Sequence, residues 1–419
     1  MIDRDRMLQD LRAMIRIPSI TGSEEVVASW AADALRELGL AVETVRPDLV
    51  AMRADPAWPG EEMPRTSLPV VIGRVGRADG RRIVLSGHLD VVPPGDRSTW
   101  TDDPWSGEVR DGMVVGRGAC DMKGGVASIL AAVRALRASG DLDRLGGELV
   151  VALVPSEEDG GQGTLAAIRA GVRGDAAIIT EPSDLDVVVA HAGAITFRLV
   201  VPGRAAHASR RREGVSALDK LFVLARALEA DEARRNAAET DPLMTALGLP
   251  YPTIIGIVNG GEWASTVLDR VTADGRYGVR LGQSEDDAAA ELSACIATAC
   301  DADEFLRDHR ATVEITGGRF GSARVPSDHP LPVGLADTVE AVTGRRPRLL
   351  GEPYGADMRL FVNVGATPCV IFGPGNVNVA HSADESVPID QVEACARVLA
   401  EWVRREVVPG AFMSAPAPQ

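Results

Sequence analysis

Apolar and polar positions follow two distinct patterns along the first part of the chain. Residues 4–16 and 23–38 carry apolar side chains every three or four positions, which predicts two amphipathic helices. Thr21 and Glu24 have the spacing of a capping box at the start of the second helix. Further on, short apolar runs predict strands at 83–86, 149–154, 176–180 and 186–190, and helical patterns between them lie at 123–139 and 163–170. Buried strands that alternate with helices predict a layered α/β domain.

A proline-rich stretch, residues 47–69, interrupts these patterns and shows neither period. Its Trp58 and Met63 are poor candidates for full exposure to water. We therefore expect an extended loop that covers another part of the molecule.

The alternation of buried strands and helices stops after Gly193 and resumes at Pro330. Between them the order is strand, helix, two strands, helix and strand, with expected bounds 194–201, 214–228, 253–258, 270–281, 284–299 and 311–315. That order predicts an inserted ferredoxin-like α+β unit. The chain then continues with a helix to 342, a strand at 369–372 and a helix at 389–406.

These patterns predict an α/β protein of two domains. The catalytic domain, with a mixed sheet flanked by helices, is expected to contain residues 1–193 and 317–419. The inserted lid domain is expected to contain residues 194–316, and residues 411–419 a frayed tail. A length of 419 residues with 45% hydrophobic and 25% charged side chains is sufficient for two such cores.

Charge and cysteine content narrow the choice of partners and compartment. A net charge of -16 argues against nucleic acid or an anionic membrane as partner, because both are negatively charged and bind basic surfaces. No apolar run approaches the roughly 18 residues of a membrane helix, and residues 1–16 do not resemble a secretory signal. The five cysteines form no CxxC pair and no dense framework, so we expect free thiols and a cytoplasmic protein.

His88 and Asp90 follow the first buried strand at a spacing that puts both side chains on one face. Asp90 is then placed to accept the second imidazole N–H of His88, or to lie just behind it, which leaves a lone pair for a metal. His-x-Asp alone is weak evidence, and a surface histidine near a turn is the simpler interpretation. Asp121 lies between a glycine-rich approach and a predicted helix that begins near Lys123, where the helix dipole favours an anion. The simpler interpretation of Asp121 is an ordinary N-cap.

Glu157 and Glu158 follow the buried strand 149–154 and are adjacent in sequence. Neighbouring carboxylates at the end of an apolar strand repel each other, and a metal relieves this for one of them. Since adjacent side chains point in different directions, one is able to bind metal while the other acts as general base. A solvated acidic turn is the alternative.

Glu181 and His381 are the weakest candidates when taken singly. Glu181 ends the strand 176–180 before a proline, and His381 follows the strand 369–372 and a Gly-Pro-Gly loop. Open α/β sheets place their sites at the carboxyl ends of strands. Together with His88, Asp121 and Glu158, these residues form a ligand set of two imidazoles and three carboxylates for a pair of divalent metals, typical of a metallohydrolase.

His207 lies in the predicted insert and is not expected to be a metal ligand if the insert is a separate lid. Its functional interpretation is a hydrogen-bond donor to an oxyanion, supplied when domains or subunits close. A structural histidine is the alternative. We assign His191, His309 and His329 to structure or solvent.

These segments together resemble the dinuclear zinc amidohydrolase family of acetylornithine deacetylase, succinyl-diaminopimelate desuccinylase and carboxypeptidase G, over essentially the whole chain and in motif order. The resemblance implies that His88 and Glu181 hold one zinc, that Glu158 and His381 hold the other, and that Asp121 bridges both. It also implies that Glu157 is the general base, that Asp90 is the partner of His88, that His207 reaches a neighbouring subunit's site in a homodimer formed through the lid, and that the Asp121–Met122 peptide is cis.

The resemblance extends to candidate substrate contacts. Asp274-Gly275-Arg276 is similar to a lid segment whose arginine contacts a substrate carboxylate, and Gly355-Ala356-Asp357 resembles a loop near the site. Ser265 lies in a lid stretch where many relatives carry an asparagine, so the substrate contact usually made there differs. The expected function is hydrolysis of the amide bond of a small N-acyl amino acid or related N-acyl amine, with two zinc ions, or cobalt or manganese in their place.

Two alternatives to a deacylase stay open. One is a dipeptidase or carboxypeptidase that uses the same site. The other is a non-catalytic binder of small molecules, which is disfavoured because every ligand position and the base are present.

Overall fold

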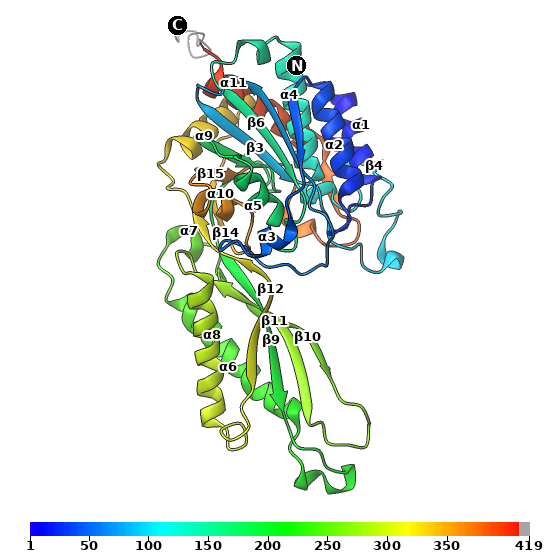
Figure 1. The fold of residues 1–419 in the computed structure, drawn as a ribbon, viewed down its shortest axis with the longest axis vertical. Helices are drawn as coiled ribbons and strands as arrows, with labels where there is room; N and C mark the ends of the chain where they lie inside the picture. Colours follow the sequence, from blue (N-terminus) through cyan, green and yellow to red (C-terminus); the bar gives the residue numbers. More distant parts are fainter. Residues whose placement is uncertain (410–419) are drawn as a thin grey trace. The chain divides into compact units, whose positions relative to one another are not determined.

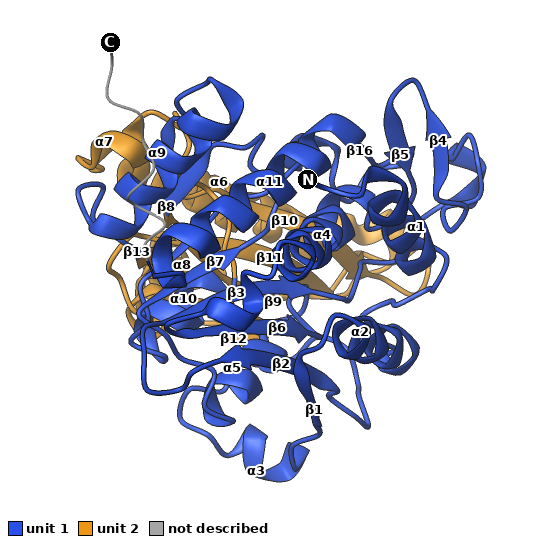
Figure 2. Ribbon diagram, turned by 90° about the horizontal axis from the view of Figure 1, so that it is seen from above, with its two compact units in different colours: residues 1–189, 324–350, 357–419 blue, residues 190–323, 351–356 orange. Residues whose placement is uncertain are grey.

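The computed structural model describes residues 1–409, so the expected tail at 411–419 lies outside the described residues. The chain divides into two compact units, which Figure 2 shows in different colours. Unit 1 contains residues 1–189 and 324–350 and the chain from 357 onward, and unit 2 contains residues 190–323 and 351–356. Among residues 1–409, no helix combines the length and the apolar character needed to cross a bilayer.

The large sheet has nine strands in the order β1-β2-β6-β3-β7-β15-β8-β13, with β14 paired to β8. Its strands are β1 (Ala41–Val45), β2 (Val70–Gly76), β3 (Arg82–His88), β6 (Glu148–Val154), β7 (Ala176–Ile179), β8 (Val187–His191), β13 (Ala323–Arg324), β14 (Leu349–Glu352) and β15 (Cys369–Ile371). The neighbours β6, β3, β7 and β15 run parallel, whereas β1–β2, β2–β6 and β15–β8 are antiparallel. Every residue of β6 is buried, as its continuous apolar run predicts. The predicted mixed sheet is therefore confirmed.

Helices cover this sheet on both faces, with α2, α4 and α11 on one side and α5 on the other (Figures 1 and 2). The helices of unit 1 are α1 (Arg4–Ile15), α2 (Glu25–Glu37), α3 (Leu49–Arg53), α4 (Gly124–Ala138), α5 (Gln162–Arg169), α9 (Pro330–Thr343), α10 (Met358–Asn363) and α11 (Ile389–Val407). In α11 the buried Val392, Ala396, Leu399 and Val403 recur at helical spacing, which explains why this segment packs along one face. The proline-rich stretch 47–69 is not wholly extended, because α3 lies within it.

A second, smaller sheet in unit 1 has three strands in the order β16-β5-β4. They are β4 (Glu108–Arg110), β5 (Met113–Val115) and β16 (Ser386–Pro388), all paired antiparallel. β16 follows directly after the segment that contains His381. This sheet therefore ties that segment to the chain leading into Asp121.

Unit 2 contains a four-stranded antiparallel sheet in the order β10-β11-β9-β12, with α6 and α8 packed on it. Its elements are β9 (Gly193–Pro202), α6 (Ala217–Ala237), α7 (Pro242–Thr245), β10 (Thr253–Gly260), β11 (Arg270–Val279), α8 (Glu285–Ala302) and β12 (Thr312–Phe320). Alternate residues of β9, from Ile195 to Val201, are buried against Leu224 of α6 and Leu292 of α8. The predicted order of strands and helices in this segment is confirmed, with the short helix α7 as an addition between α6 and β10.

Unit 2 is larger than the insert expected at 194–316. It begins at residue 190, and it extends to 323 because β12 continues to Phe320 and pairs there with Ala194 of β9. It also includes residues 351–356. The roles of catalytic domain and lid stay predictions for units 1 and 2.

Candidate metal centre

Three neighbouring parallel strands of unit 1 bring acidic and imidazole side chains to one edge of the sheet. β3 ends at His88, β6 is followed by Glu157 and Glu158, and β7 is followed closely by Glu181. Because β6, β3 and β7 are adjacent and parallel, their carboxyl ends meet at the same edge. This explains how residues almost a hundred positions apart come together.

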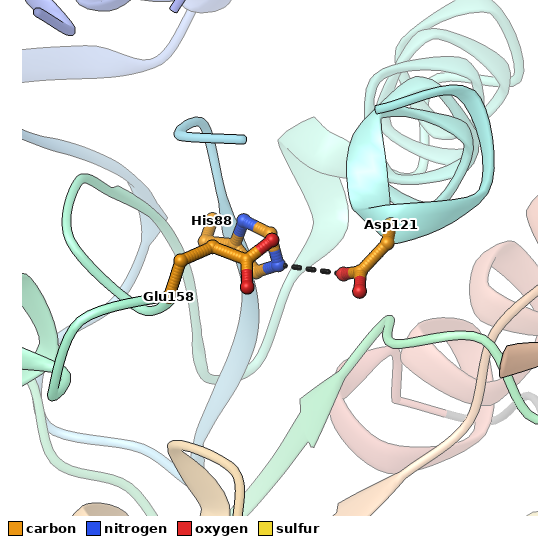
Figure 3. Close-up of side chains that lie close together, drawn as sticks. All are labelled: His88, Asp121 and Glu158. Carbon is orange, nitrogen blue, oxygen red and sulfur yellow. Dashed lines mark hydrogen bonds and ion pairs between the residues drawn. The ribbon is translucent and has the colours of Figure 1, made fainter. Parts of the chain in front are cut away.

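Asp121 lies between the two histidines. His88 Nε2 is 2.9 Å from Asp121 Oδ1, and His381 Nε2 is 3.4 Å from Asp121 Oδ2. Figure 3 shows His88 and Asp121 facing each other, with Glu158 beside them. Each oxygen of the Asp121 carboxylate thus faces a different imidazole, which is the arrangement that a bridging ligand requires.

Each of the two remaining carboxylates lies beside a different histidine. Glu181 Oε1 lies 3.5 Å from His88 Nε2, and Glu158 Oε2 lies 3.1 Å from His381 Nε2. Donor atoms of His88, Asp121 and Glu158 lie within 4.8 Å of one another, and so do those of His88, Glu157 and Glu181. The structure therefore gathers all five residues that the sequence suggested as ligands.

The cluster is buried on one side and open on the other. His88 is 1% exposed and the carboxylates around it are mostly buried, whereas the side chain of His381 is 54% exposed. His381 also adopts a positive φ of 59°, so its loop turns sharply at this residue. Solvent and small molecules therefore reach the cluster from the side of His381.

Burial gives the carboxylates unusual proton affinities. It raises the pKa of Glu158 to about 7 and that of Glu181 to about 8, and the nearby Asp121 charge adds to both shifts. The hydrogen bonds to Asp121 and Glu158 raise the pKa of His381 to about 10. Asp121 is itself partly buried, which raises its pKa, but its bonds to His381 and His88 outweigh this and hold the pKa below the ordinary value. Crowded, buried carboxylates of this kind fit divalent cations, whose charge would neutralise them.

The imidazole of His88 is oriented by a main-chain carbonyl. Its Nδ1 lies 2.9 Å from the carbonyl oxygen of Asp90, which only accepts hydrogen bonds, so Nδ1 carries the proton. Nε2 faces the carboxylates of Asp121 and Glu181 and donates to Asp121 at 2.9 Å; with a metal bound, the lone pair of this nitrogen would be directed at the ion instead. The Asp90 carboxylate is 3.6 Å from Nδ1, so the first of the two placements expected for this side chain, as acceptor from His88, is not the one observed.

The Asp90 carboxylate instead holds the turn that carries the two glutamates. It accepts the main-chain N–H of Glu157 at 3.1 Å and of Glu158 at 3.2 Å. The hydroxyl of Thr21 donates to it at 3.0 Å. The expected capping box is therefore wrong: α2 has no side-chain cap, because Thr21 bonds Asp90.

The side chains of Glu157 and Glu158 point in different directions, as expected for adjacent residues at a strand end. Glu158 lies against His381, whereas the carboxylate of Glu157 lies near His88 and Glu181. Burial and the neighbouring Asp357 raise the pKa of Glu157 well above its ordinary value. Glu157 is thus a buried acid with high proton affinity, beside the ligand cluster.

Glu385 is a residue of this site that the sequence analysis did not single out. Its buried carboxylate accepts the main-chain N–H of Gly118 at 3.1 Å, and of Cys120 and Asp121 at 2.9 Å, and pairs with Arg117 at 2.5 Å. Asp121 therefore lies in an irregular turn fixed by Glu385, and α4 begins after Lys123 instead of at an Asp121 N-cap. The Asp121–Met122 peptide is cis, as the resemblance implied. The only signal for Glu385 was its place four residues after His381.

Of the predicted substrate contacts, Asp357 lies in unit 1 and the other three lie in unit 2. Asp357 is buried, and its Oδ2 accepts a hydrogen bond from Thr164 at 2.5 Å. Ser265, Arg276 and Gly355 belong to unit 2, so their roles stay predictions.

His207 also belongs to unit 2, where its Nδ1 accepts the N–H of Ser209 at 3.2 Å. Its Nε2 then carries a proton that is available for donation. Of the histidines assigned to structure, His309 stacks on Phe305, His329 caps α9, and Nδ1 of buried His191 bonds the carbonyl of Ala192.

Comparison with known proteins identifies a family. The model of peptidase family M20/M25/M40 matches residues 84–405. Succinyl-diaminopimelate desuccinylase of Methylorubrum extorquens is 32% identical over 407 residues, covering 91% of this chain and 94% of the relative. N-formyl-4-amino-5-aminomethyl-2-methylpyrimidine deformylase of Bacillus subtilis is 27% identical, covering 90% of this chain and 88% of the relative.

Solved structures share the fold. An M20 family metallo-carboxypeptidase from Sulfolobus solfataricus superposes with a TM-score of 0.74 at 17% identity, covering 96% of this chain and 99% of that one. A dinuclear metal-binding M20 peptidase from Bacillus subtilis has a TM-score of 0.61 at 15% identity, covering 96% and 97%.

Proposed function

Because this chain belongs to peptidase family M20/M25/M40, we propose that it is a metal-dependent deacylase that hydrolyses the amide bond of a small N-acyl amino acid or related amine. The observation that carries the proposal is the cluster of two imidazoles and three carboxylates with Glu157 directed to its side. The relatives named as a desuccinylase and a deformylase support removal of a small acyl group.

We propose that the cluster holds two divalent cations. His88 and Glu181 would hold one, Glu158 and His381 the other, and Asp121 both. Imidazole and carboxylate donors suit zinc, with cobalt or manganese as replacements. When bound, such a pair supplies Lewis-acid chemistry that polarises the scissile carbonyl and lowers the pKa of water.

The protein's own residues move the protons. Glu157 takes the proton of the attacking water and delivers it to the leaving amine, roles for which a carboxylate beside the ligand cluster is placed. The Asp90 carboxylate keeps Glu157 in place through its main-chain N–H. His207, through its Nε2–H, is proposed as the donor that stabilises the oxyanion of the tetrahedral intermediate.

We further propose a homodimer formed through unit 2. β10 is an edge strand, and its Ile254, Ile257 and Val258 are 61%, 55% and 50% exposed. Phe222 of α6, in the same unit, is 55% exposed. Exposed apolar side chains on an edge strand favour pairing with a second copy. An Ile254→Asp variant that stays dimeric in light scattering would contradict this interface.

A reducing compartment, and hence the cytoplasm, is proposed for the protein. All five cysteines are free, and four of them are buried. Free, buried thiols are usual where disulfides do not form.

An assay of amine release tests the function. Purified protein with bound metal is compared on N-succinyl, N-formyl and N-acetyl amino acids and on dipeptides, before and after chelation. We expect release from an N-acyl compound that chelation abolishes and Zn²⁺ restores. Faster cleavage of dipeptides than of every N-acyl compound would favour the peptidase alternative, and metal binding without any cleavage the non-catalytic one.

A further inference from the structure

The proline-rich segment 47–69 packs onto the turn that carries Glu157 and Glu158. The carboxylate of Asp159, the next residue of that turn, accepts the main-chain N–H of Met63 at 3.2 Å and of Glu62 at 3.4 Å. Gln162, just after the turn, donates its amide to the carbonyl of Gly60. The segment therefore covers this turn.

Arg65 is the charged centre of this contact. Its side chain is 0% exposed, and its Nη2 lies 2.8 Å from both oxygens of Asp159. Its Nη1 lies 3.5 Å from Glu24, which is also buried and accepts the N–H of Gly22 at 2.8 Å. A buried guanidinium between two buried carboxylates is a rigid connection, because each charge lacks water and depends on the others.

The turn at 156–161 is thus held from two sides. On one side Asp90 binds the main-chain N–H of Glu157 and Glu158. On the other side Asp159 binds Arg65 and also accepts the hydroxyl of Ser156 at 2.5 Å. Ser156 has a φ of 70°, a sparsely populated conformation for a residue with a side chain, so the turn depends on these bonds to keep its shape.

We propose that Arg65 is a positioning residue for the reaction. Through Asp159 it fixes the turn, and the turn sets the directions of the Glu157 and Glu158 side chains. This inference rests on the proposed function for the roles of the two glutamates. It assigns a part in catalysis to the segment 47–69, which contributes no ligand and no base.

The test compares Arg65→Gln with Arg53→Gln. Arg53 lies in the same segment and also binds a carboxylate, that of Glu61, at 3.0 and 3.1 Å, but its side chain is 40% exposed. For R65Q we expect kcat about 100-fold lower with KM little changed, because a small displacement of a reacting group has an effect of this order. For R53Q both constants should stay within about twofold, as is usual for an exposed ion pair.

Two further measurements do not depend on turnover. Titration of the metal-free protein with Zn²⁺ should show binding about 10- to 100-fold weaker in R65Q, because Glu158 is no longer held. Hydrogen exchange in the metal-free protein should be faster at the amides of 157–161 in R65Q and unchanged in R53Q. The effects of R65Q and D159N on Zn²⁺ affinity and on amide exchange should be non-additive, because the two residues act through one contact.

The outcomes separate the two proposals. A wild-type protein without amidase activity would overturn the proposed function, while Zn²⁺ titration and exchange would still test Arg65. An R65Q protein with the exchange, Zn²⁺ affinity and kcat of R53Q would overturn the inference. If R65Q does not fold, R65K serves instead: it keeps the charge but not the planar group, and we expect an intermediate loss of kcat. Full activity in R65K would also overturn the inference.

Discussion

Both units bury charged side chains, but the buried cluster around Arg235 in unit 2 and the one around Asp121 in unit 1 differ in how far their charges match. In unit 2 the guanidinium of Arg235 is fully buried, stacks 4.0 Å from the ring centre of Tyr277 and donates to the carbonyl of Gly278. The hydroxyl of Tyr277 donates to Asp231 at 2.7 Å. Glu291 in turn accepts from Arg234 at 2.7 Å and from Arg280, through Nη2, at 3.1 Å.

In unit 1 the cluster contains more acid than base. Glu157 and the three carboxylate ligands share two imidazoles, and burial raises the pKa of each of these three glutamates. A buried network whose charges match maintains a fold, whereas buried acids in excess are typical of sites that bind cations or move protons. Matched charges are therefore typical of a structural network such as that of unit 2, and the excess of acid in unit 1 supports the proposed site.

The largest expected effect is on catalysis in unit 1. Glu157→Gln should lower kcat by about 100- to 10,000-fold, because a general base contributes a factor of this size. The bound metal, measured by elemental analysis, should be unchanged. Glu158→Gln, one residue further, should lose metal as well as activity. Equal metal loss in both variants would contradict the division of roles between the two glutamates.

The next effect is on stability in unit 2. Arg235→Met should lower the free energy of unfolding by about 2–4 kcal/mol, because it removes the stacking on Tyr277 and leaves the buried carbonyl of Gly278 without its side-chain donor. Urea denaturation measures the loss, and Zn²⁺ binding by the folded variant should be unchanged. Arg198, which pairs with Asp274 at the surface of the same unit, provides the control. Arg198→Gln should lower the free energy of unfolding by less than about 1 kcal/mol. A similar loss in both variants would show that the buried network contributes no more to stability than a surface ion pair.

Removing the metal should affect unit 1 alone. Zn²⁺ at a hundred times its dissociation constant should stabilise the folded protein by about 2.7 kcal/mol relative to the chelated protein. Hydrogen exchange should slow around residues 88, 121 and 158 and remain the same in β9 and β11. Slower exchange in unit 2 as well would mean that the two units respond to metal together.

The smallest expected effect is a pH dependence in unit 2. Burial alone raises the pKa of Glu352 from its ordinary value of 4.5 to about 7. Because the folded-state pKa is the higher one, the free energy of unfolding falls as the pH rises from about 4.5 to about 7. Glu352→Gln should therefore be more stable than wild type by about 1–3 kcal/mol at pH 8 and much closer to it at pH 5.

Thermal denaturation at the two pH values measures this difference. Glu213→Gln, at an exposed position of unit 2, is the matched control and should show none. An equal gain in stability at pH 8 in both variants would mean that the effect comes from the change in net charge and not from the burial of Glu352.

The candidate ligands were predictable because each follows a recognisable strand or turn. Continuous apolar runs located β3, β6 and β7, and the acidic or imidazole residues just after them were the natural candidates. The residues that hold those ligands were less visible. Arg65 lies in a stretch without periodicity, and Glu385 is one acid among many. Their roles depend on main-chain N–H groups and buried partners far away in sequence, which no local pattern encodes.

The sequence by itself determined the layered α/β architecture, the inserted α+β unit and the ligand types, because hydrophobic period and strand-end chemistry are local properties. Only the tertiary structure decided that the Asp90 carboxylate binds the Glu157–Glu158 turn and that Thr21 bonds Asp90 instead of capping a helix. The physical reason is that a polar group buried on folding must find a hydrogen-bond partner among the groups buried with it. Those groups are known only once distant segments have packed together.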